Sequence, residues 1–315
     1  MSTPYHVAVI GLGAMGMGAA RSCLRAGLTT YGIDLNEEAR NQLQQAGATA
    51  VMADARPLAE TLDAVLLLVV NATQVRRILL GNEGLAHHLK PGTAIEGLAH
   101  HLKPGTAIMV SSTIAAEEAS ALAAELAQLG LPMLDAPVSG GAIKADAGEM
   151  TVMAAGSDAA FDKLAPVLDA VAGKVYRVGS EPGQGSTVKI IHQLLAGVHI
   201  AVAAEAMALA SRAGVSLDLM YDVVTHAAGN SWMFENRMPR VLAGDYQARS
   251  AVDIFVKDLT LVADTAKALR FPLPLASTAL NMFLGASNAG YGQEDDSAVI
   301  KIFSGIQLPG QEDQA

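Results

Sequence analysis

Cysteines, aromatic residues and long apolar runs are scarce in this 315-residue chain. Cys23 is the single cysteine, so no disulfide can form within the chain, and a reducing compartment is expected. The apolar run at 64–70 is far shorter than the roughly 20 residues that a membrane-spanning helix needs. No basic segment of the kind that opens a signal sequence precedes the first apolar residues. We therefore expect a cytoplasmic protein with no membrane segment.

Basic residues are also in the minority, because 21 lysines and arginines stand against 31 acidic residues, a net charge of −10. This balance offers no positive surface for a nucleic-acid backbone or an anionic membrane, so neither is expected as a partner. Hydrophobic residues make up 51% of the chain and charged residues 17%, which is typical of a folded globular protein. The length allows two domains, each with its own core.

In the first half of the chain, short apolar segments alternate with amphipathic, alanine-rich segments. This alternation is typical of βαβ units that form a parallel sheet. Strands are expected at 6–10, 29–33, 64–70, 106–111, 132–135, 150–155 and 174–178. We predict an α/β fold whose first domain, residues 1–178, is a Rossmann doubly wound parallel sheet that binds NAD.

After residue 178, glycines and Pro182 interrupt the chain, and no further strand is predicted. Helices are expected at 186–213, 217–228, 232–238, 254–269 and 273–290, the third of them stopped by Pro239. The first of these helices would be about 42 Å long at the standard rise, enough to join two domains. We predict an all-α second domain over residues 179–315 that binds substrate and forms the oligomer.

Thirteen residues, EGLAHHLKPGTAI, occur twice in tandem, at 83–95 and 96–108. Two copies are too few, and the unit too short, for a repeat architecture. An insertion before a strand costs only loop-closure entropy, which grows slowly with length. We expect a surface bulge whose removal leaves cofactor affinity and turnover nearly unchanged.

The repeat also places histidines side by side, as His87 and His88 and again as His100 and His101. Adjacent histidines point apart on a helix, and metal sites usually pair histidine with spaced Cys, Asp or Glu ligands. We expect a solvated helix end and no metal.

Residues 7–18, VAVIGLGAMGMG, combine a strand, a tight turn and the start of a helix. Gly11 permits the turn, Gly13 lets the backbone approach a pyrophosphate, and Gly16 allows close packing of the helix on the strand. Asp34 ends the next strand, where a carboxylate can bind both ribose hydroxyls of NAD and repel the extra phosphate of NADP. A structural turn in another open sheet, for a flavin or a methyl donor, remains the alternative. The predicted cofactor contacts of this motif are Gly11, Leu12, Gly13, Ala14, Met15, Gly16 and Asp34.

Lys189, His192 and Gln193 follow the i, i+3, i+4 spacing that puts side chains on one face of a helix. Oxidation of an alcohol needs a base to take the hydroxyl proton as hydride leaves the carbon. A lysine can serve if burial or the cationic nicotinamide lowers its pKa. An ordinary solvated lysine and a core histidine remain the alternatives for these positions.

Two glycine-rich stretches, DAPVSGGAIKADAG at 135–148 and GQGSTVKIIHQ at 183–193, are more distinctive than the first motif. Together with GLGAMG, SST at 111–113 and KDL at 257–259, they make nearly the whole chain resemble the β-hydroxyacid dehydrogenase family. The resemblance implies that Lys189 is the catalytic acid/base and that Gln193 binds substrate. It also implies that Thr113 lies near the nicotinamide and that Lys257 reaches the cofactor or substrate. The small residues of the SGG turn leave backbone N–H groups to hold a substrate carboxylate. That turn is Ser139, Gly140 and Gly141.

The family usually has asparagine at the position of His192, where it helps to bind substrate. The replacement resembles the branch that acts on four-carbon sugar acids and implies oxidation of L-threonate to 2-oxotetronate. A buried partner for an extra hydroxyl would discriminate strongly against substrates that lack it. Oxidation of 3-hydroxyisobutyrate, reduction of tartronate semialdehyde, action on a phosphorylated acid, and a non-catalytic dinucleotide-binding interaction protein remain alternatives. Family members are dimers or tetramers, so a homodimer or homotetramer is expected.

Overall fold

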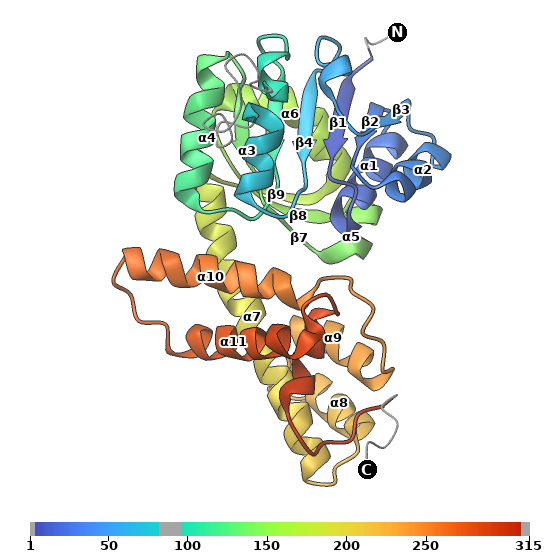
Figure 1. The fold of residues 1–315 in the computed structure, drawn as a ribbon, viewed down its shortest axis with the longest axis vertical. Coiled ribbons are helices and arrows are strands. Elements are labelled where there is room, and N and C mark those ends of the chain that lie inside the picture. Colours follow the sequence, from blue (N-terminus) through green and yellow to red (C-terminus); the bar gives the residue numbers. More distant parts are fainter. Residues whose placement is uncertain (1–3, 82–95, 310–315) are drawn as a thin grey trace, which may run out of the picture. The chain divides into compact units, whose positions relative to one another are not determined.

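The computed structural model describes residues 4–81 and 96–309, which divide into two compact units, 1–189 and 190–315 (Figure 1). The division falls inside the helix α7 (Gln184–Arg212), so this one helix contributes to both units. Its existence confirms the long interdomain helix expected from the sequence. The domain boundary after residue 178 stays a prediction.

In the described part of the first unit, nine strands form one mostly parallel sheet. The first six run parallel in the order 3-2-1-4-5-6, which is that of the doubly wound dinucleotide-binding fold. β8 continues the sheet, antiparallel to β6 and β7 and parallel to β9. The predicted fold class is thus confirmed. The strands are β1 (His6–Ile10), β2 (Thr29–Ile33), β3 (Ala50–Met52), β4 (Ala64–Leu67), β5 (Ala107–Val110), β6 (Met133–Asp135), β7 (Val138–Ser139), β8 (Met150–Ala155) and β9 (Ala172–Gly179).

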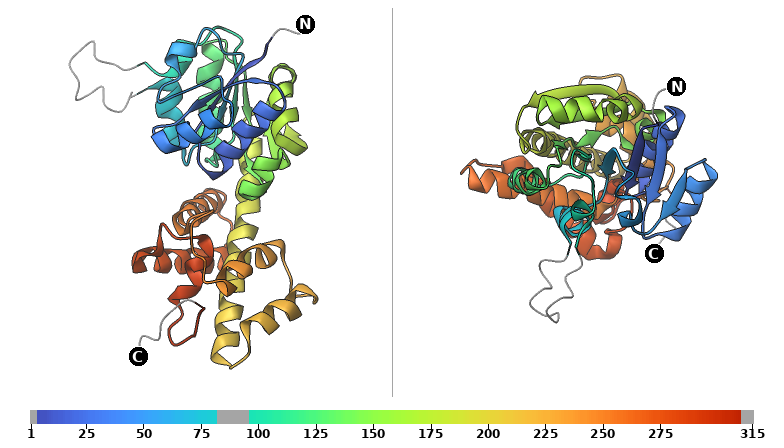
Figure 2. Two further views of the ribbon diagram at one scale, coloured as in Figure 1. Left: turned by 90° about the vertical axis from the view of Figure 1, so that its right-hand side faces the viewer. Right: turned by 90° about the horizontal axis from the view of Figure 1, so that it is seen from above.

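Helices cover both faces of this sheet (Figure 2). In β1, Val7 and Val9 belong to a core cluster with α1 and α6, while Ala8 and Ile10 belong to a second cluster with α3 and α4. A strand buried on both faces is a nearly continuous apolar run, which is why the sequence pattern was clear there. The helices are α1 (Ala14–Arg25), α2 (Glu37–Gln45), α3 (Ala72–Leu80), α4 (Ala116–Gln128), α5 (Gly141–Ala147) and α6 (Asp158–Val171), with short turns η1 (Arg56–Leu58) and η3 (Leu98–His100).

The described part of the second unit, residues 190–309, consists of helices joined by loops, and the one β-type pairing there is an isolated bridge between Ala251 and Asp295. Gly197 of α7 allows α10 to pack closely, because a Cβ there would lie 2.8 Å from a methyl carbon of Leu259. Phe255 and Phe283 stack in the core with ring centroids 5.2 Å apart. The remaining elements are α8 (Leu217–Thr225), α9 (Trp232–Leu242), α10 (Val252–Ala268), α11 (Pro274–Ala286), η4 (Ser287–Tyr291) and η5 (Asp296–Ile302).

Two helix ends in this unit differ from the sequence prediction by four residues each. Pro239 does not stop α9, which continues to Leu242. Proline removes the N–H that would bond to the Glu235 carbonyl, and the Tyr221 hydroxyl donates to that carbonyl instead, at 3.4 Å. The last predicted helix, 273–290, ends as an α-helix at Ala286, and a π turn follows in which Gly290 has a φ of +94°.

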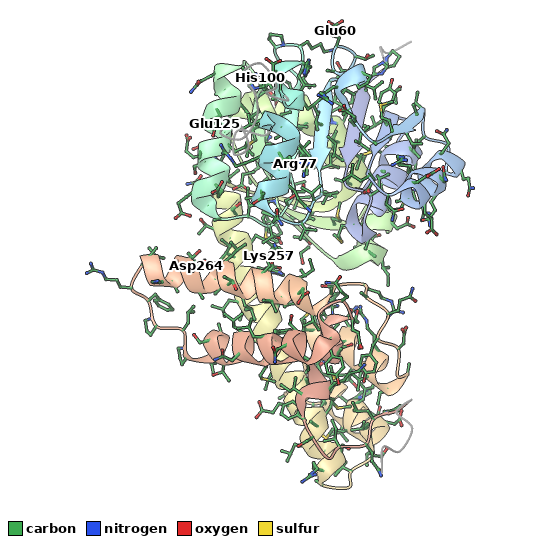
Figure 3. All side chains as sticks on the ribbon, viewed as in Figure 1. Glu60, Arg77, His100, Glu125, Lys257 and Asp264 are labelled. Carbon is green, nitrogen blue, oxygen red and sulfur yellow. The ribbon has the colours of Figure 1, made fainter. Side chains whose placement is uncertain are left out.

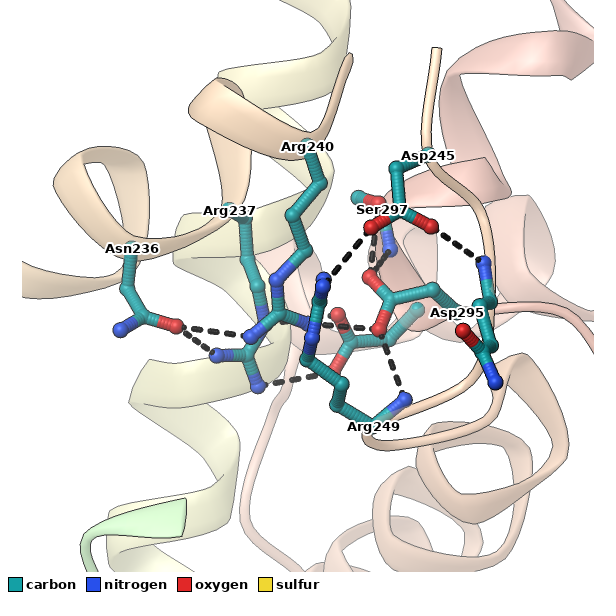
Figure 4. Close-up of polar contacts among 9 residues, drawn as sticks. Asn236, Arg237, Arg240, Asp245, Arg249, Asp295 and Ser297 are labelled. Carbon is teal, nitrogen blue, oxygen red and sulfur yellow. Dashed lines mark hydrogen bonds and ion pairs between the residues drawn. The ribbon is translucent and has the colours of Figure 1, made fainter. Parts of the chain in front are cut away.

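A buried group of arginines and aspartates joins α9 to η5 (Figure 4). Arg237 donates two hydrogen bonds to Asp296, at 2.7 and 2.9 Å, and Arg240 donates to Asp295 at 2.5 Å. Burial raises the pKa of Asp296. Burial acts in the same direction on Asp295, but hydrogen bonds from Arg240 and Ser297 hold the pKa of that carboxyl below its ordinary value. These pairs fix the end of the helical unit against α9.

Within the described residues, α7 is the one helix long and apolar enough to span a membrane by length and composition. Half of its most apolar stretch is buried inside the chain.

Candidate functional site

Two positions around the turn between β1 and α1 have no room for a side chain. Gly11 has a φ of +91°, and a Cβ there would lie 2.6 Å from the carbonyl oxygen of Leu68. A Cβ on Gly16 would lie 1.7 Å from the carbonyl oxygen of Gly11. At Gly13, in contrast, nothing lies within 4 Å of a Cβ position, so this backbone is open to a ligand. The turn therefore has the close packing and the opening that a pyrophosphate requires.

The first turn of α1 also fits a negatively charged ligand. Gly13 is its N-cap, no side chain caps it, and no acidic residue lies in its first turn. Backbone N–H groups at a helix N-terminus have no partner within the helix and carry a partial positive charge. Together with the opening at Gly13, they fit the phosphates of a dinucleotide.

Asp34 lies at the end of β2 and contacts this same turn. Its Oδ2 accepts a hydrogen bond from the backbone N–H of Leu12 at 2.6 Å, and its Oδ1 accepts one from Asn36 at 2.8 Å. Each carboxylate oxygen has two lone pairs, so both can still accept from a ribose hydroxyl. Asp34 therefore orients the turn as well as presenting a carboxylate beside it.

A cavity of about 660 Å³ contains Gly11, Gly13 and Asp34 in its wall, entirely within the first unit. It lies at the carboxyl ends of β1 to β4, where the strand order reverses between β1 and β4, as in dinucleotide-binding sheets. The sequence interpretation missed several of its polar residues, although each follows a strand that ends at this edge. They are Asp54, Arg56, Gln74 and Arg77, the last visible on α3 in Figure 3.

The tandem repeat borders the same cavity. Gly81 and Glu96 form an antiparallel bridge, and both line the cavity together with Gly97 and Leu98. The bulge predicted for 83–95, with His87 and His88, lies outside the described residues. His100 ends η3. Across 4–81 and 96–309, no three histidine, cysteine or acidic side chains form a possible metal site.

Buried Asp135, at the end of β6, binds the first turn of α7. Its Oδ2 accepts from the backbone N–H groups of Gly183 and Ser186 at 2.7 and 2.8 Å, and its Oδ1 accepts from the Ser186 hydroxyl at 2.7 Å. Burial raises the pKa of Asp135, and these hydrogen bonds oppose the rise. Lys189 lies one turn further along α7, and only 6% of its surface is exposed. Asp135 thus fixes the start of the helix that carries Lys189.

The turn predicted to hold the substrate carboxylate begins at Ser139, four residues after Asp135. Ser139 ends β7 and is paired with Thr151 of β8. Gly140 and Gly141 have φ values of +133° and +72°, which explains why glycine occupies both positions. Thr113 follows β5, next to Ser112, whose hydroxyl accepts a hydrogen bond from the backbone of Val69. In the described structure, neither this turn nor Thr113 lines the cofactor cavity.

In the second unit, a chain of polar contacts joins three of the predicted site residues. His192 Nδ1 lies 3.0 Å from Gln193 Oε1, and Gln193 Nε2 donates to Asp258 Oδ2 at 2.5 Å. Lys257, labelled on α10 in Figure 3, forms an ion pair with Asp258 Oδ1 at 2.6 Å. Asp258 is 2% exposed and was not predicted as a site residue, although it is the second residue of the KDL motif. Asp253, a possible helix-surface partner of Lys257, accepts from Ser287 and Gln293.

Comparison with known proteins agrees with this geometry. Residues 183–303 match the family described as NAD-binding of NADP-dependent 3-hydroxyisobutyrate dehydrogenase. Residues 6–95 and 93–179 match the NAD binding domain of 6-phosphogluconate dehydrogenase, and the two pieces meet at the end of the first repeat copy.

Two curated relatives carry the same name. The chain is 70% identical over 306 residues to L-threonate dehydrogenase of Escherichia coli O6:H1 (strain CFT073), covering 97% of each chain. It is 65% identical over 305 residues to L-threonate dehydrogenase of Haemophilus influenzae, again covering 97% of each. A solved structure from Salmonella typhimurium, named 3-hydroxyisobutyrate dehydrogenase, is 68% identical with a TM-score of 0.88 and covers 95% of this chain and 100% of its own.

Proposed function

We propose that this chain, which belongs to the 3-hydroxyisobutyrate dehydrogenase-related family of β-hydroxyacid dehydrogenases, oxidises L-threonate to 2-oxotetronate with NAD. The observation that carries the proposal is 70% identity to an L-threonate dehydrogenase over 97% of both chains. His192 supports the same substrate, since it stands where the family usually has asparagine and could bind a further hydroxyl.

The first unit supplies the cofactor site. Gly11 to Gly16 and the N-terminus of α1 bind the pyrophosphate, and Asp34 binds the ribose hydroxyls of the adenosine half. Thr113 and Lys257 are proposed as further cofactor contacts. When bound, NAD accepts the hydride that leaves C2 of the acid. The carboxylate of Asp34 favours NAD over NADP, because it would repel the phosphate on the ribose of NADP.

The chemical step is assigned to α7. Lys189 takes the proton of the C2 hydroxyl as the carbonyl forms, and returns a proton in the reverse reaction. Its burial excludes water from the side chain and favours the neutral amine, which is the form that can accept this proton. The backbone of Ser139, Gly140 and Gly141 binds the substrate carboxylate. His192 and Gln193, three and four residues after Lys189, bind the rest of the sugar acid.

The protein is further proposed to be cytoplasmic and to form a homodimer or homotetramer. Ile191, Leu195, Val202 and Leu209 of α7 are all more than half exposed. Their spacing of four, seven and seven residues puts them on one side of the helix. Such an apolar stripe is typical of a helix that packs against a second copy of the chain.

A panel of hydroxy acids tests the reaction, with NADH formation as the readout. L-Threonate should have the highest kcat/KM, with 3-hydroxyisobutyrate and glycerate lower by about 100-fold or more, since a site that binds hydroxyls rejects substrates lacking them. Lys189→Ala should lower kcat by about 100-fold or more while NAD still binds. Lys267→Ala, at an exposed position near the end of α10, is the matched control.

The panel also decides between the two names carried by close relatives. A preference for 3-hydroxyisobutyrate would support the activity for which the solved structure is named and would refute L-threonate as the substrate. Full turnover by Lys189→Ala would remove the lysine from the chemical step.

A further inference from the structure

We propose that Asp258 is a positioning residue that fixes the proton of His192 on Nδ1, through Gln193, and so presents His192 Nε2 as an acceptor for a substrate hydroxyl. The last step, in which Nε2 meets the substrate, rests on the proposed function. The first steps depend only on contacts within the second unit.

The carboxylate of Asp258 has two partners, Lys257 and Gln193. It is almost fully buried, its Oδ1 forms an ion pair with the Lys257 ammonium at 2.6 Å, and a carboxylate in such a pair only accepts hydrogen bonds. Gln193 lies 2.5 Å from its other oxygen and is itself 7% exposed. A carboxylate oxygen cannot face an amide oxygen at this distance without repulsion. The NH₂ group of Gln193 must therefore point to Asp258.

This orientation of Gln193 determines the tautomer of His192. With its NH₂ group on Asp258, the amide presents Oε1 to the imidazole, and the Nδ1 to Oε1 distance is 3.0 Å. An amide oxygen only accepts, so the proton of this bond belongs to His192 Nδ1. In a neutral imidazole the second nitrogen is then an acceptor. Asp258, acting through the side chain of Gln193, thus makes Nε2 of His192 a hydrogen-bond acceptor.

An acceptor at Nε2 selects for a substrate with an O–H group at that point. The asparagine usual in the family offers an acceptor and a donor on one amide and makes no such selection. A substrate that lacks the hydroxyl cannot make this hydrogen bond, so it should bind less tightly. Since the same carboxylate also holds Lys257, one buried acid orients residues from both α7 and α10.

Asp258→Asn tests the proposal in the full-length protein. The oxygen of the new amide should stay on the Lys257 ammonium, and its NH₂ group should face Gln193. The side-chain amide of Gln193 should then turn over, so that its NH₂ group faces Nδ1 of His192. Nδ1 becomes the acceptor, and the ring proton moves to Nε2. NMR of ¹⁵N-histidine-labelled protein distinguishes the protonated from the unprotonated ring nitrogen, and the His192 signals are identified by their loss in His192→Asn.

The kinetic readout uses L-threonate and its two monodeoxy analogues, 2,3-dihydroxybutanoate and 2,4-dihydroxybutanoate. In the unmodified protein, at least one analogue should be rejected by about 100-fold in kcat/KM. Asp258→Asn should lower kcat/KM for L-threonate by about 10- to 100-fold and reduce that rejection to less than about tenfold. A purely structural role would lower kcat/KM for all three acids equally.

Asp222→Asn is the matched control. It removes the same charge next to another histidine, because Asp222 lies 3.4 Å from His226 Nδ1, but both side chains are more than 70% exposed. Neither the tautomer of His192 nor the ratios of kcat/KM among the three acids should change. If Asp258→Asn does not fold, Gln193→Leu breaks the same connection, and His192 should then populate both tautomers.

A His192 that keeps its proton on Nδ1 in Asp258→Asn, or in Gln193→Leu, would overturn the proposal. So would unchanged discrimination among the three acids. If the unmodified protein does not turn over L-threonate, the proposed function fails, and the NMR measurement alone still decides whether Asp258 sets the tautomer.

Discussion

Asp34 combines two tasks in one carboxylate. It accepts hydrogen bonds from the backbone of Leu12 and of Asn36, and it lines the cavity beside Gly11 and Gly13. The first task gives the glycine-rich turn its orientation, and the second gives the cavity a negative charge at the place proposed for a ribose. A substitution at this position should therefore affect cofactor choice more than the fold.

Asp34→Ala should lower kcat/KM for NAD by about 10- to 100-fold, since a hydrogen bond to a charged group contributes about 1.5–3 kcal/mol. The loss for NADP should be smaller, because the variant no longer repels the additional phosphate. Initial rates with both cofactors measure this ratio. Glu37→Gln, an exposed acid in the first turn of α2, is the control and should leave the ratio unchanged. An unchanged ratio in Asp34→Ala would refute the role of the carboxylate.

Residues inside a contiguous motif could be predicted from the sequence, and residues brought in by tertiary contact could not. Gly11 and Gly13 lie in one motif and share one cavity wall. Asp258 could not be predicted as a site residue from the sequence. Its hydrogen bond to Gln193 joins residues 65 positions apart and depends on the packing of α10 against α7. Arg56 and Gln74 follow strands at the same sheet edge, but a strand end alone does not distinguish a cavity residue from a loop residue.

At the scale of elements, the length of a segment decided whether it could be predicted. The long apolar strands and most helices lie within a few residues of the predicted positions. β3 and β7, of three and two residues, are too short to show a periodic pattern and were missed. The predicted end of α9 was wrong for another reason. The helix continues past Pro239, and the Tyr221 hydroxyl of α8 donates to the Glu235 carbonyl that the proline leaves without its usual N–H partner.

The tandem repeat gives a prediction for an element. Removal of residues 83–95 leaves the same sequence as removal of 96–108, so one copy of the Glu-Gly-Leu segment that lines the cavity at 96–98 is retained. The affinity for NAD and kcat should each change by less than about threefold, because loop length contributes little free energy.

Fluorescence titration with NADH and steady-state rates measure these two quantities. A Gly/Ser segment of equal length in place of 83–95 is the companion variant, which separates the effect of length from that of sequence. A tenfold or larger loss in the deletion would show that the inserted copy takes part in cofactor binding.

At the scale of the whole molecule, the exposed stripe of α7 predicts self-association. Analytical ultracentrifugation at micromolar concentration should show a dimer or tetramer. Leu195→Asp combined with Val202→Asp should shift the protein toward monomer, because a charge in an apolar interface must lose its hydration. Tyr176→Ser, at a half-exposed position on β9, is the control and should keep the oligomer. A monomer in the unmodified protein would contradict the proposed assembly.

The contact between Asp135 and the start of α7 also affects how this helix unravels. The first N–H groups of most helices have no strong partner, so fraying begins there as readily as at the other end. In α7, the Gly183 and Ser186 amides are instead bonded to a buried carboxylate of the central sheet. Asp135 therefore opposes fraying at the start of α7, in the turn that precedes Lys189.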